Sequence, residues 1–180
     1  KMKHEFDVWA LNQEENTPPL WVGLKLFNVY GPNEYHKHKN ASMIYKAYNE
    51  ILSYGSLHLF KSYKSEIENG GQIRDFIYVK DVVKILVHLW KNAQESGIYN
   101  AGTGEGRSFW ELATIVFKIL GMQPTIAFEE IPESIRESFP YFAVADIQKL
   151  RNAGYQEPFW DLKEGAEDYI QKFLMRGDFY

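Results

Sequence analysis

The sequence contains no cysteine, which excludes disulfides, zinc–thiolate sites and thiol catalysis. It has no basic excess either: 20 Lys and Arg stand against 24 Asp and Glu, for a net charge of -4. That balance argues against a nucleic-acid binder, because such proteins carry a basic patch or stripe. No apolar run approaches the roughly 20 residues that a membrane span needs, and no signal peptide opens the chain. We therefore expect a soluble, cytoplasmic globular protein with no nucleic-acid or membrane partner.

Aromatic residues are abundant, with 12 Phe, 12 Tyr and 5 Trp in 180 residues, and 45% of the chain is hydrophobic. This is enough for one well-buried core. Gly, Pro and Asn divide the chain into alternating pieces. The patterns predict strands at 20–27, 57–60, 76–79, 98–100 and 125–128, and helices at 1–12, 41–54, 81–90, 108–121, 146–153 and 162–175. Such alternation is typical of an α/β domain with a largely parallel sheet.

Three local patterns give more detailed expectations. The helix at 41–54 presents one apolar face that includes Leu52. Asp81 stands where an N-cap of the next long helix is expected. Ser108 and Glu111 form a capping box, in which the hydroxyl and the carboxylate each accept from a backbone N–H. Residues 28–32 are expected to leave the preceding strand as a loop.

The glycine-rich segment 102–106 follows a strand and precedes a helix, the context in which such a loop can bind pyrophosphate. Its spacing is wrong, however, because Arg107 stands where the dinucleotide fingerprint needs a third glycine. No acidic residue follows at the position of a ribose clamp, and no Walker-type Gly-Lys-Ser/Thr sequence exists. We interpret the segment as a tight turn.

Two clusters of polar residues have both a functional and a structural interpretation. Glu34, His36 and His38 resemble part of a metal site, but no further ligand is evident, so the sequence favours a solvated loop and no metal. Arg74 and Asp75 precede a buried strand. The arginine either pairs with its neighbour or faces a cleft, where its fork would suit a diphosphate. The sequence leaves both options open.

Four stretches in this order resemble the extended short-chain dehydrogenase/reductase family. They are Leu26-Phe27-Asn28-Val29-Tyr30-Gly31-Pro32, Arg74-Asp75-Phe76-Ile77-Tyr78-Val79-Lys80-Asp81, Tyr99-Asn100-Ala101-Gly102-Thr103-Gly104 and Ala145-Asp146. Within it, Gly31-Pro32-Asn33-Glu34-Tyr35-His36-Lys37 is similar to the loop of the ADP-L-glycero-D-manno-heptose 6-epimerase family. Further similar stretches are Ala41-Ser42-Met43, Leu59-Phe60, Ala153-Gly154-Tyr155 and Pro158-Phe159. The resemblance covers nearly all 180 residues, but only the C-terminal part of those enzymes.

The resemblance implies the C-terminal part of a Rossmann-type parallel sheet plus a small α/β substrate-binding domain. Residues 1–40 would complete the NADP-binding domain, and 41–180 would be mostly substrate-binding, with about 74–100 returning to the Rossmann sheet. The family's glycine loop, catalytic Ser and catalytic Tyr would all precede Lys1. An isolated fragment of this kind is expected to be inactive.

The implied activity is an isomerase reaction, epimerisation of an ADP-heptose at C6 through transient oxidation by NADP, with NAD also possible, in lipopolysaccharide inner-core precursor synthesis. Two lysines match catalytic residues. Lys37 matches the second acid/base residue, and Lys3 the residue that holds the nicotinamide ribose and lowers the pKa of the catalytic tyrosine. Val29 would lie beside the nicotinamide, so Lys3, Val29 and Lys37 would contact the cofactor. The positions that match substrate contacts are Asn28, Lys39, Lys46, Phe60, Lys61, Ser62, Tyr63, Arg74 and Phe139. The family carries Tyr at the position of Phe139, and the loop 64–71 is longer than usual.

Other assignments remain open at this stage. A hexose 4-epimerase or a 4,6-dehydratase of the same family is the nearest alternative, and His36-Lys37 favours the heptose enzyme. An alternative of a different class is a non-catalytic module that binds a sugar nucleotide. The density of aromatic residues favours a homo-oligomer.

Overall fold

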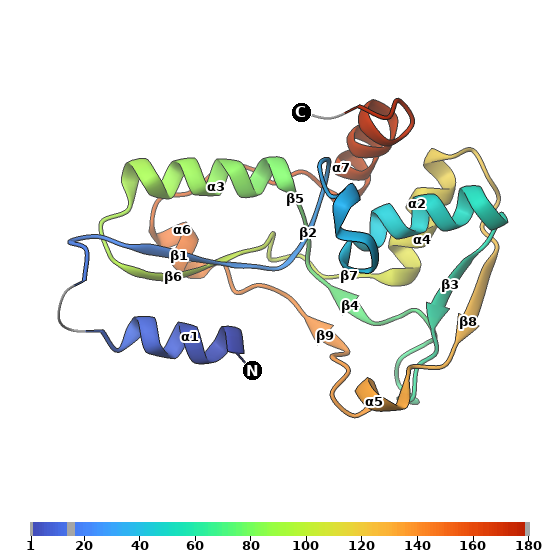
Figure 1. Ribbon diagram of the computed structural model, residues 1–180, viewed down its shortest axis with the longest axis horizontal. Helices are drawn as coiled ribbons and strands as arrows, with labels where there is room; N and C mark the ends of the chain where they lie inside the picture. The colour runs from blue at the N-terminus through green and yellow to red at the C-terminus, as the bar shows by residue number, and fades with distance from the viewer. Residues whose placement is uncertain (1, 14–16, 179–180) are drawn as a thin grey trace.

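The computed structural model describes residues 2–13 and 17–178 as an α/β fold (Figure 1). The elements are, in order, α1 (Met2–Leu11), β1 (Val22–Leu26), β2 (Asn28–Tyr30), η1 (Tyr35–Asn40), α2 (Met43–Tyr54), β3 (Leu57–Phe60), β4 (Ile73–Arg74), β5 (Phe76–Tyr78), α3 (Val79–Asn92), β6 (Gly97–Ala101), β7 (Arg107–Ser108), α4 (Phe109–Ile119), β8 (Ile126–Glu129), α5 (Glu133–Arg136), β9 (Phe142–Ala143), α6 (Gln148–Asn152), α7 (Leu162–Tyr169) and the π-helix η2 (Ile170–Leu174).

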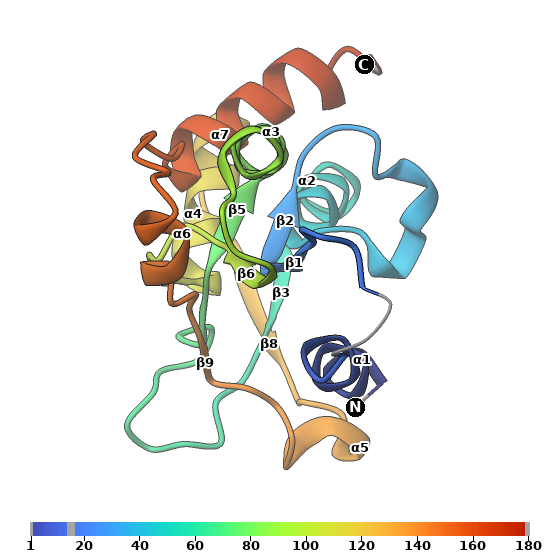
Figure 2. The same cartoon turned by 90° about the vertical axis from the view of Figure 1, so that its left-hand side faces the viewer.

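The strands pair mostly in parallel, as the sequence predicts. β1 pairs with β6, β2 with β5 and β3 with β8, all in parallel, and β4 lies between antiparallel β7 and parallel β9. Figures 1 and 2 both show α1 and α3 on opposite sides of the β1–β6 pair. The pairing of β2 with β5 therefore brings the segment around β2 close to the segment that contains β4 and β5, although the two are far apart in the sequence.

Two clusters of buried apolar residues hold these layers together. The larger cluster packs α2, α4 and α7 against β3 and β5, with Ile51, Phe117 and Tyr169 completely buried. The smaller cluster packs α3 and α6 against β6, around Ile85 and Leu150. Burial of each large apolar side chain contributes about 1.5–3 kcal/mol, so these clusters are the main source of stability.

The structure corrects four local predictions. Leu52 is 55% exposed, because it lies just outside the buried stripe of α2. Helix α3 begins after Tyr78, and Asp81 is a buried first-turn residue that accepts from Trp160 N–H, so it is not the N-cap. Ser108 does cap α4, but the Glu111 carboxylate pairs with Arg107 and so does not complete a capping box. Residues 28–30 form strand β2.

Asp75 joins three segments at the centre of the fold. Its buried carboxylate accepts from Thr103 N–H and Oγ1 at 2.8 Å each, Gly104 N–H at 2.9 Å and Ala145 N–H at 3.1 Å. A Cβ at Gly102 would lie 2.6 Å from Asp75 Oδ2, so the close approach requires glycine. The backbone amides of the glycine-rich segment therefore bind an internal carboxylate, and the interpretation as a turn is confirmed.

Asp168 anchors the C-terminal helix α7. The buried carboxylate accepts from Tyr78 Oη and Lys80 Nζ, both at 2.7 Å, and from Lys172 Nζ. Burial alone would raise the pKa of Asp168, but the hydrogen bonds from Lys172, Lys80 and Tyr78 outweigh it and lower the pKa to about 2. This cluster fixes α7 against β5 and α3.

This lowered pKa predicts a pH dependence of stability. In the unfolded chain Asp168 regains its ordinary pKa of 3.8, so from there down to about pH 2 the unfolded state binds a proton that the folded state does not. Stability is therefore lost as the pH falls through that window. Asp168→Asn should cost about 2 kcal/mol at pH 7 and flatten this loss, as measured by urea unfolding at each pH. Glu167→Gln, at an exposed position of α7, is the control; an Asp168→Asn variant with wild-type pH dependence would contradict the assignment.

Candidate functional site

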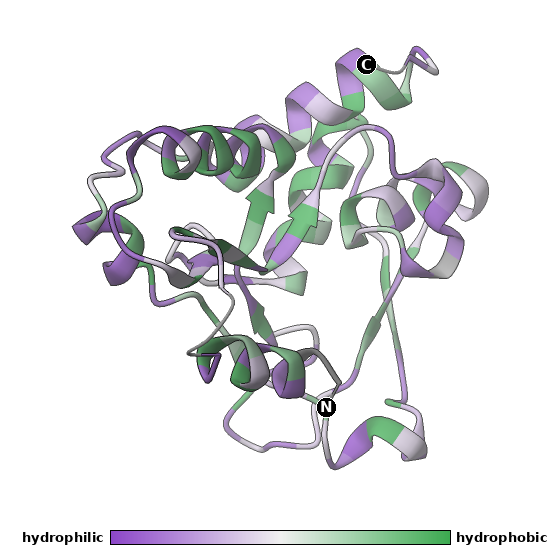
Figure 3. Cartoon of the chain, turned by 60° about the vertical axis from the view of Figure 1, so that its left-hand side comes forward, coloured by the Kyte–Doolittle hydropathy of each residue, from purple (hydrophilic) through white to green (hydrophobic). Residues whose placement is uncertain are grey.

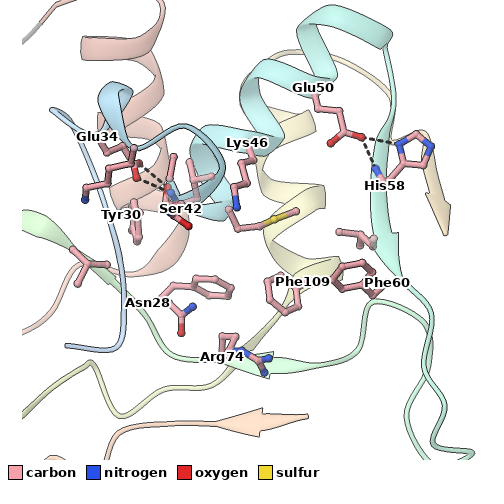
Figure 4. A pocket seen from close by; sticks show the side chains of 18 of the residues that line it. Asn28, Tyr30, Glu34, Ser42, Lys46, Glu50, His58, Phe60, Arg74 and Phe109 are labelled. Atoms are coloured by element: carbon pink, nitrogen blue, oxygen red, sulfur yellow. Dashed lines mark hydrogen bonds and ion pairs between the residues drawn. The ribbon is translucent and has the colours of Figure 1, made fainter. Parts of the chain in front are cut away.

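A cleft of about 600 Å³ opens where β2, α2, β3 and β4 meet (Figure 4). Seven of the residues predicted to contact the cofactor or the substrate line it: Asn28, Val29, Lys37, Lys46, Phe60, Arg74 and Phe139. They come from separate parts of the chain, which the parallel strand pairs bring together. In Figure 4, Lys46 extends from α2 into the cleft from above, and Asn28 and Arg74 lie along its lower side.

Asn28 and Val29 are the first two residues of β2. Parallel pairing with β5 holds this strand, and Asn28 N–H donates to the Asp75 carbonyl at 3.0 Å. The Asn28 side chain is exposed, while Val29 is half-buried. Gly31 follows with φ of 144°, and a Cβ there would lie 2.4 Å from Val79 Cγ1. Only glycine lets the chain turn at this point into the segment that carries Lys37.

Lys37 lies in the 3₁₀ helix η1, and its side chain is exposed at the edge of the cleft. Its backbone N–H donates to the Glu34 carbonyl at 2.9 Å. Glu34 is buried rather than solvated: its carboxylate accepts from Ser42 N–H and Oγ, both at 2.6 Å. Within the described ranges, no three His, Cys, Asp or Glu side chains come together as a metal site.

Arg74 places a buried positive charge in the cleft. It is only 7% exposed, and among the described residues its guanidinium makes a single hydrogen bond, to the Ile73 carbonyl at 2.8 Å. Asp75, its sequence neighbour, accepts from four other donors, so the pairing that the sequence left open does not form. No carboxylate of the described residues pairs with the guanidinium. Burial lowers the pKa of Arg74, and an anion in the cleft would offset that desolvation.

Aromatic rings surround this guanidinium. Its carbon lies 5.4 Å from the ring centres of both Phe109 and Phe139, and Phe60 packs edge-on against Phe139. Phe109 is the first residue of α4, positioned by the Ser108 cap. The rings screen the charge from water and give the cleft an apolar wall, against which a flat group can stack.

Sequence reasoning missed a second polar group at the other end of the cleft. The ring nitrogen Nδ1 of His58 lies 2.7 Å from Glu50 Oε1, and the same oxygen accepts a hydrogen bond from the backbone N–H of His58 at 2.8 Å. Both residues line the cleft, from β3 and α2 respectively. No sequence motif marks the pair, because it depends on how α2 turns into β3.

Three of the predicted substrate residues do not line the cleft. Lys61 Nζ pairs with Glu130 Oε1 at 2.6 Å, Tyr63 Oη donates to the other oxygen of Glu130, and Ser62 Oγ donates to the Lys64 carbonyl at 3.0 Å. They fasten the long loop that follows β3. The side chains of Lys3 and Lys39 lie outside the described residues, so their predicted roles stay predictions.

Comparisons with known proteins identify relatives of this chain. The model of the NAD dependent epimerase/dehydratase family matches residues 1–102. The ADP-L-glycero-D-manno-heptose-6-epimerase of Fusobacterium nucleatum is 44% identical over 99% of this chain and 55% of its own length. That of Nitratidesulfovibrio vulgaris is 40% identical over 98% of this chain and 54% of its own length. The chain thus spans about half the length of the curated relatives it matches.

A solved structure of a related epimerase has a similar fold. The crystal structure of the Helicobacter pylori ADP-L-glycero-D-manno-heptose-6-epimerase superposes with a TM-score of 0.74 at 30% identity, covering 94% of this chain and 48% of that one. These matches confirm the resemblance seen in the sequence and the expected α/β architecture with parallel strand pairs. The chain belongs to the NAD dependent epimerase/dehydratase family.

Proposed function

We propose that this chain contributes the substrate site of an enzyme that epimerises ADP-D-glycero-D-manno-heptose to ADP-L-glycero-D-manno-heptose at C6 of the heptose. The buried Arg74 guanidinium, unpaired with any described carboxylate, carries the proposal. Such a group suits a diphosphate, because its planar fork can donate two parallel hydrogen bonds to phosphate oxygens. Lys37 and Lys46 line the same cleft and add positive charge.

We infer the orientation of the bound substrate from the residues that line the cleft. With the diphosphate at Arg74, the sugar would lie toward Asn28 and Lys37, and the adenosine toward Phe60 and Phe139. The apolar wall of the cleft suits a nucleobase. Asn28 would bind a sugar hydroxyl through its exposed amide. Lys46 would approach the substrate from the α2 side.

The residues present fit a dinucleotide cofactor at its nicotinamide end. Val29 offers a half-buried apolar surface in the cleft, next to Asn28 in the sequence. When bound, the dinucleotide supplies reversible hydride chemistry. We infer NADP, with NAD as the alternative, and assign the nicotinamide ribose to Lys3. Residues 1–40 and about 74–100 would form part of the cofactor-binding sheet, and the rest of 41–180 the substrate-binding part.

Lys37 would move a proton at the C6 hydroxyl. Epimerisation needs an acid/base group on each face of the carbon, because each epimer presents its hydroxyl from a different side. Lys37 lines the cleft and would serve one face. A cytoplasmic location and a role in lipopolysaccharide precursor synthesis follow from the proposed substrate.

Self-association also stays a prediction. Phe6, Trp9 and Trp90 are 63%, 57% and 79% exposed, and Figure 3 shows apolar residues along both α1 and α3. Exposed patches of this kind often mark contacts between subunits.

No helix of the described residues is long and apolar enough to cross a membrane.

The role of Lys37 can be tested by NMR of the epimer ratio, with protein expressed from its complete reading frame. Lys37→Ala should lower epimerisation of ADP-D-glycero-D-manno-heptose by about 100-fold or more, because general acid/base groups contribute that much. Lys91→Ala, an exposed lysine on α3 outside the cleft, should keep the wild-type rate. Full activity of Lys37→Ala would refute its role, and turnover of UDP- or dTDP-hexoses alone would refute the substrate.

The diphosphate site is tested separately by calorimetric titration with ADP. Arg74→Lys keeps the charge but loses the bidentate fork, so ADP affinity should fall by about tenfold or more. Arg107→Lys is the matched control, since Arg107 pairs with Glu105 and Glu111 outside the cleft. Equal ADP affinity for wild type and Arg74→Lys would place the diphosphate elsewhere.

A further inference from the structure

The C-terminal helix α7 is connected to the Lys37 segment by one buried carboxylate. Glu34 is 3% exposed, and Tyr169 of α7 donates its hydroxyl proton to Glu34 Oε1 at 3.0 Å. Ser42, the N-cap of α2, donates Oγ–H to the same oxygen and its backbone N–H to Oε2, both at 2.6 Å. The carboxylate thus links its own segment to the start of α2, which follows directly in the sequence, and to the distant helix α7.

All the hydrogen bonds to this carboxylate come from uncharged donors. No lysine, arginine or histidine of the described chain pairs with Glu34, and Lys37, three residues on, contacts it only through the backbone. Burial and the adjacent Glu34 raise the pKa of Tyr169, so its hydroxyl stays protonated and remains a donor. The ammonium group of Lys37 is therefore not neutralised by the nearest carboxylate in the sequence.

The segment that this network holds is strained. Asn33 has φ of 68°, and His38 has φ of 46° with ψ of -120°. Asparagine adopts a positive φ more readily than other residues that carry a side chain. The angles of His38 are rare, cost about 1–3 kcal/mol and persist only where surrounding contacts enforce them. Both lie within four residues of Lys37, one on each side of it. Because the Glu34 carbonyl also accepts from Lys37 N–H, the buried side chain and the strained turn act on the same short helix.

We propose that Glu34, Ser42 and Tyr169 are positioning residues, which hold the strained segment 33–40 so that Lys37 stays directed at the reacting carbon. This inference rests on the proposed function of Lys37. It gives α7 a part in the site although Tyr169 does not line the cleft. Loss of one bond should let the segment relax and displace Lys37. Small displacements of an acid/base group lower kcat while leaving substrate contacts in place.

The test compares kcat and KM for ADP-D-glycero-D-manno-heptose in the complete protein, at a temperature where circular dichroism shows each variant to be folded. Tyr169→Phe should lower kcat by about tenfold and change KM by less than about twofold. Tyr155→Phe is the matched control: Tyr155 is 1% exposed, but its hydroxyl has no hydrogen-bond partner among the described residues. Its kcat should equal that of wild type.

A second pair of variants covers the case in which Tyr169→Phe does not fold. Ser42→Ala removes the hydroxyl and should lower kcat, whereas Ser42→Thr keeps it and should restore activity. A lower melting temperature with unchanged kcat would overturn the inference, since the network would then be structural only. A higher KM with unchanged kcat would also overturn it. Inactive wild-type protein would instead refute the proposed function itself.

Discussion

A buried charge must find partners, and the two adjacent charges of Arg74 and Asp75 find them in different places. The Asp75 carboxylate is satisfied internally, by donors from the segments at 103–104 and 145. Arg74 directs its guanidinium into the cleft, against Phe109 and Phe139. Successive residues of an extended chain point to opposite sides, so one short segment both ties the fold together and presents a cation to a ligand. The position of the cleft, its charge and its apolar wall all depend on this division.

The other wall of the cleft depends on a different constraint. The segment after Gly31 must turn sharply and then hold a lysine at the edge of the cleft. It does so with a positive φ at Asn33 and with an unfavourable backbone conformation at His38. The buried Glu34 carboxylate compensates by joining that turn to α2 and α7. Asp168, the residue of α7 that precedes Tyr169, keeps this helix in place by accepting hydrogen bonds from Tyr78 of β5 and Lys80 of α3. Stability and the geometry of the site are thus linked through one helix.

The sequence predicted the order of elements and the parallel pairing well, because hydrophobic periodicity and glycine punctuation are local signals. It failed where the outcome depends on packing partners: Leu52 has no neighbour to bury it, and Asp81 is drawn inward by Trp160 N–H. Family resemblance identified seven residues that line one cleft. Neither the sequence patterns nor the family resemblance could predict the side-chain hydrogen bonds of Glu34 with Tyr169 and of Glu50 with His58, because no local pattern encodes them. The substrate roles of Lys61, Ser62 and Tyr63 stay predictions, since the side chains of Lys61 and Ser62 are hydrogen-bonded within the loop.

A crystal structure of the complete protein with ADP-heptose tests the central claim most directly. The account predicts that the diphosphate accepts hydrogen bonds from both arms of the Arg74 guanidinium, with C6 of the heptose facing Lys37. The adenine should lie against Phe60 and Phe139. A diphosphate bound outside the cleft, or a heptose directed away from Lys37 and Asn28, would contradict the account.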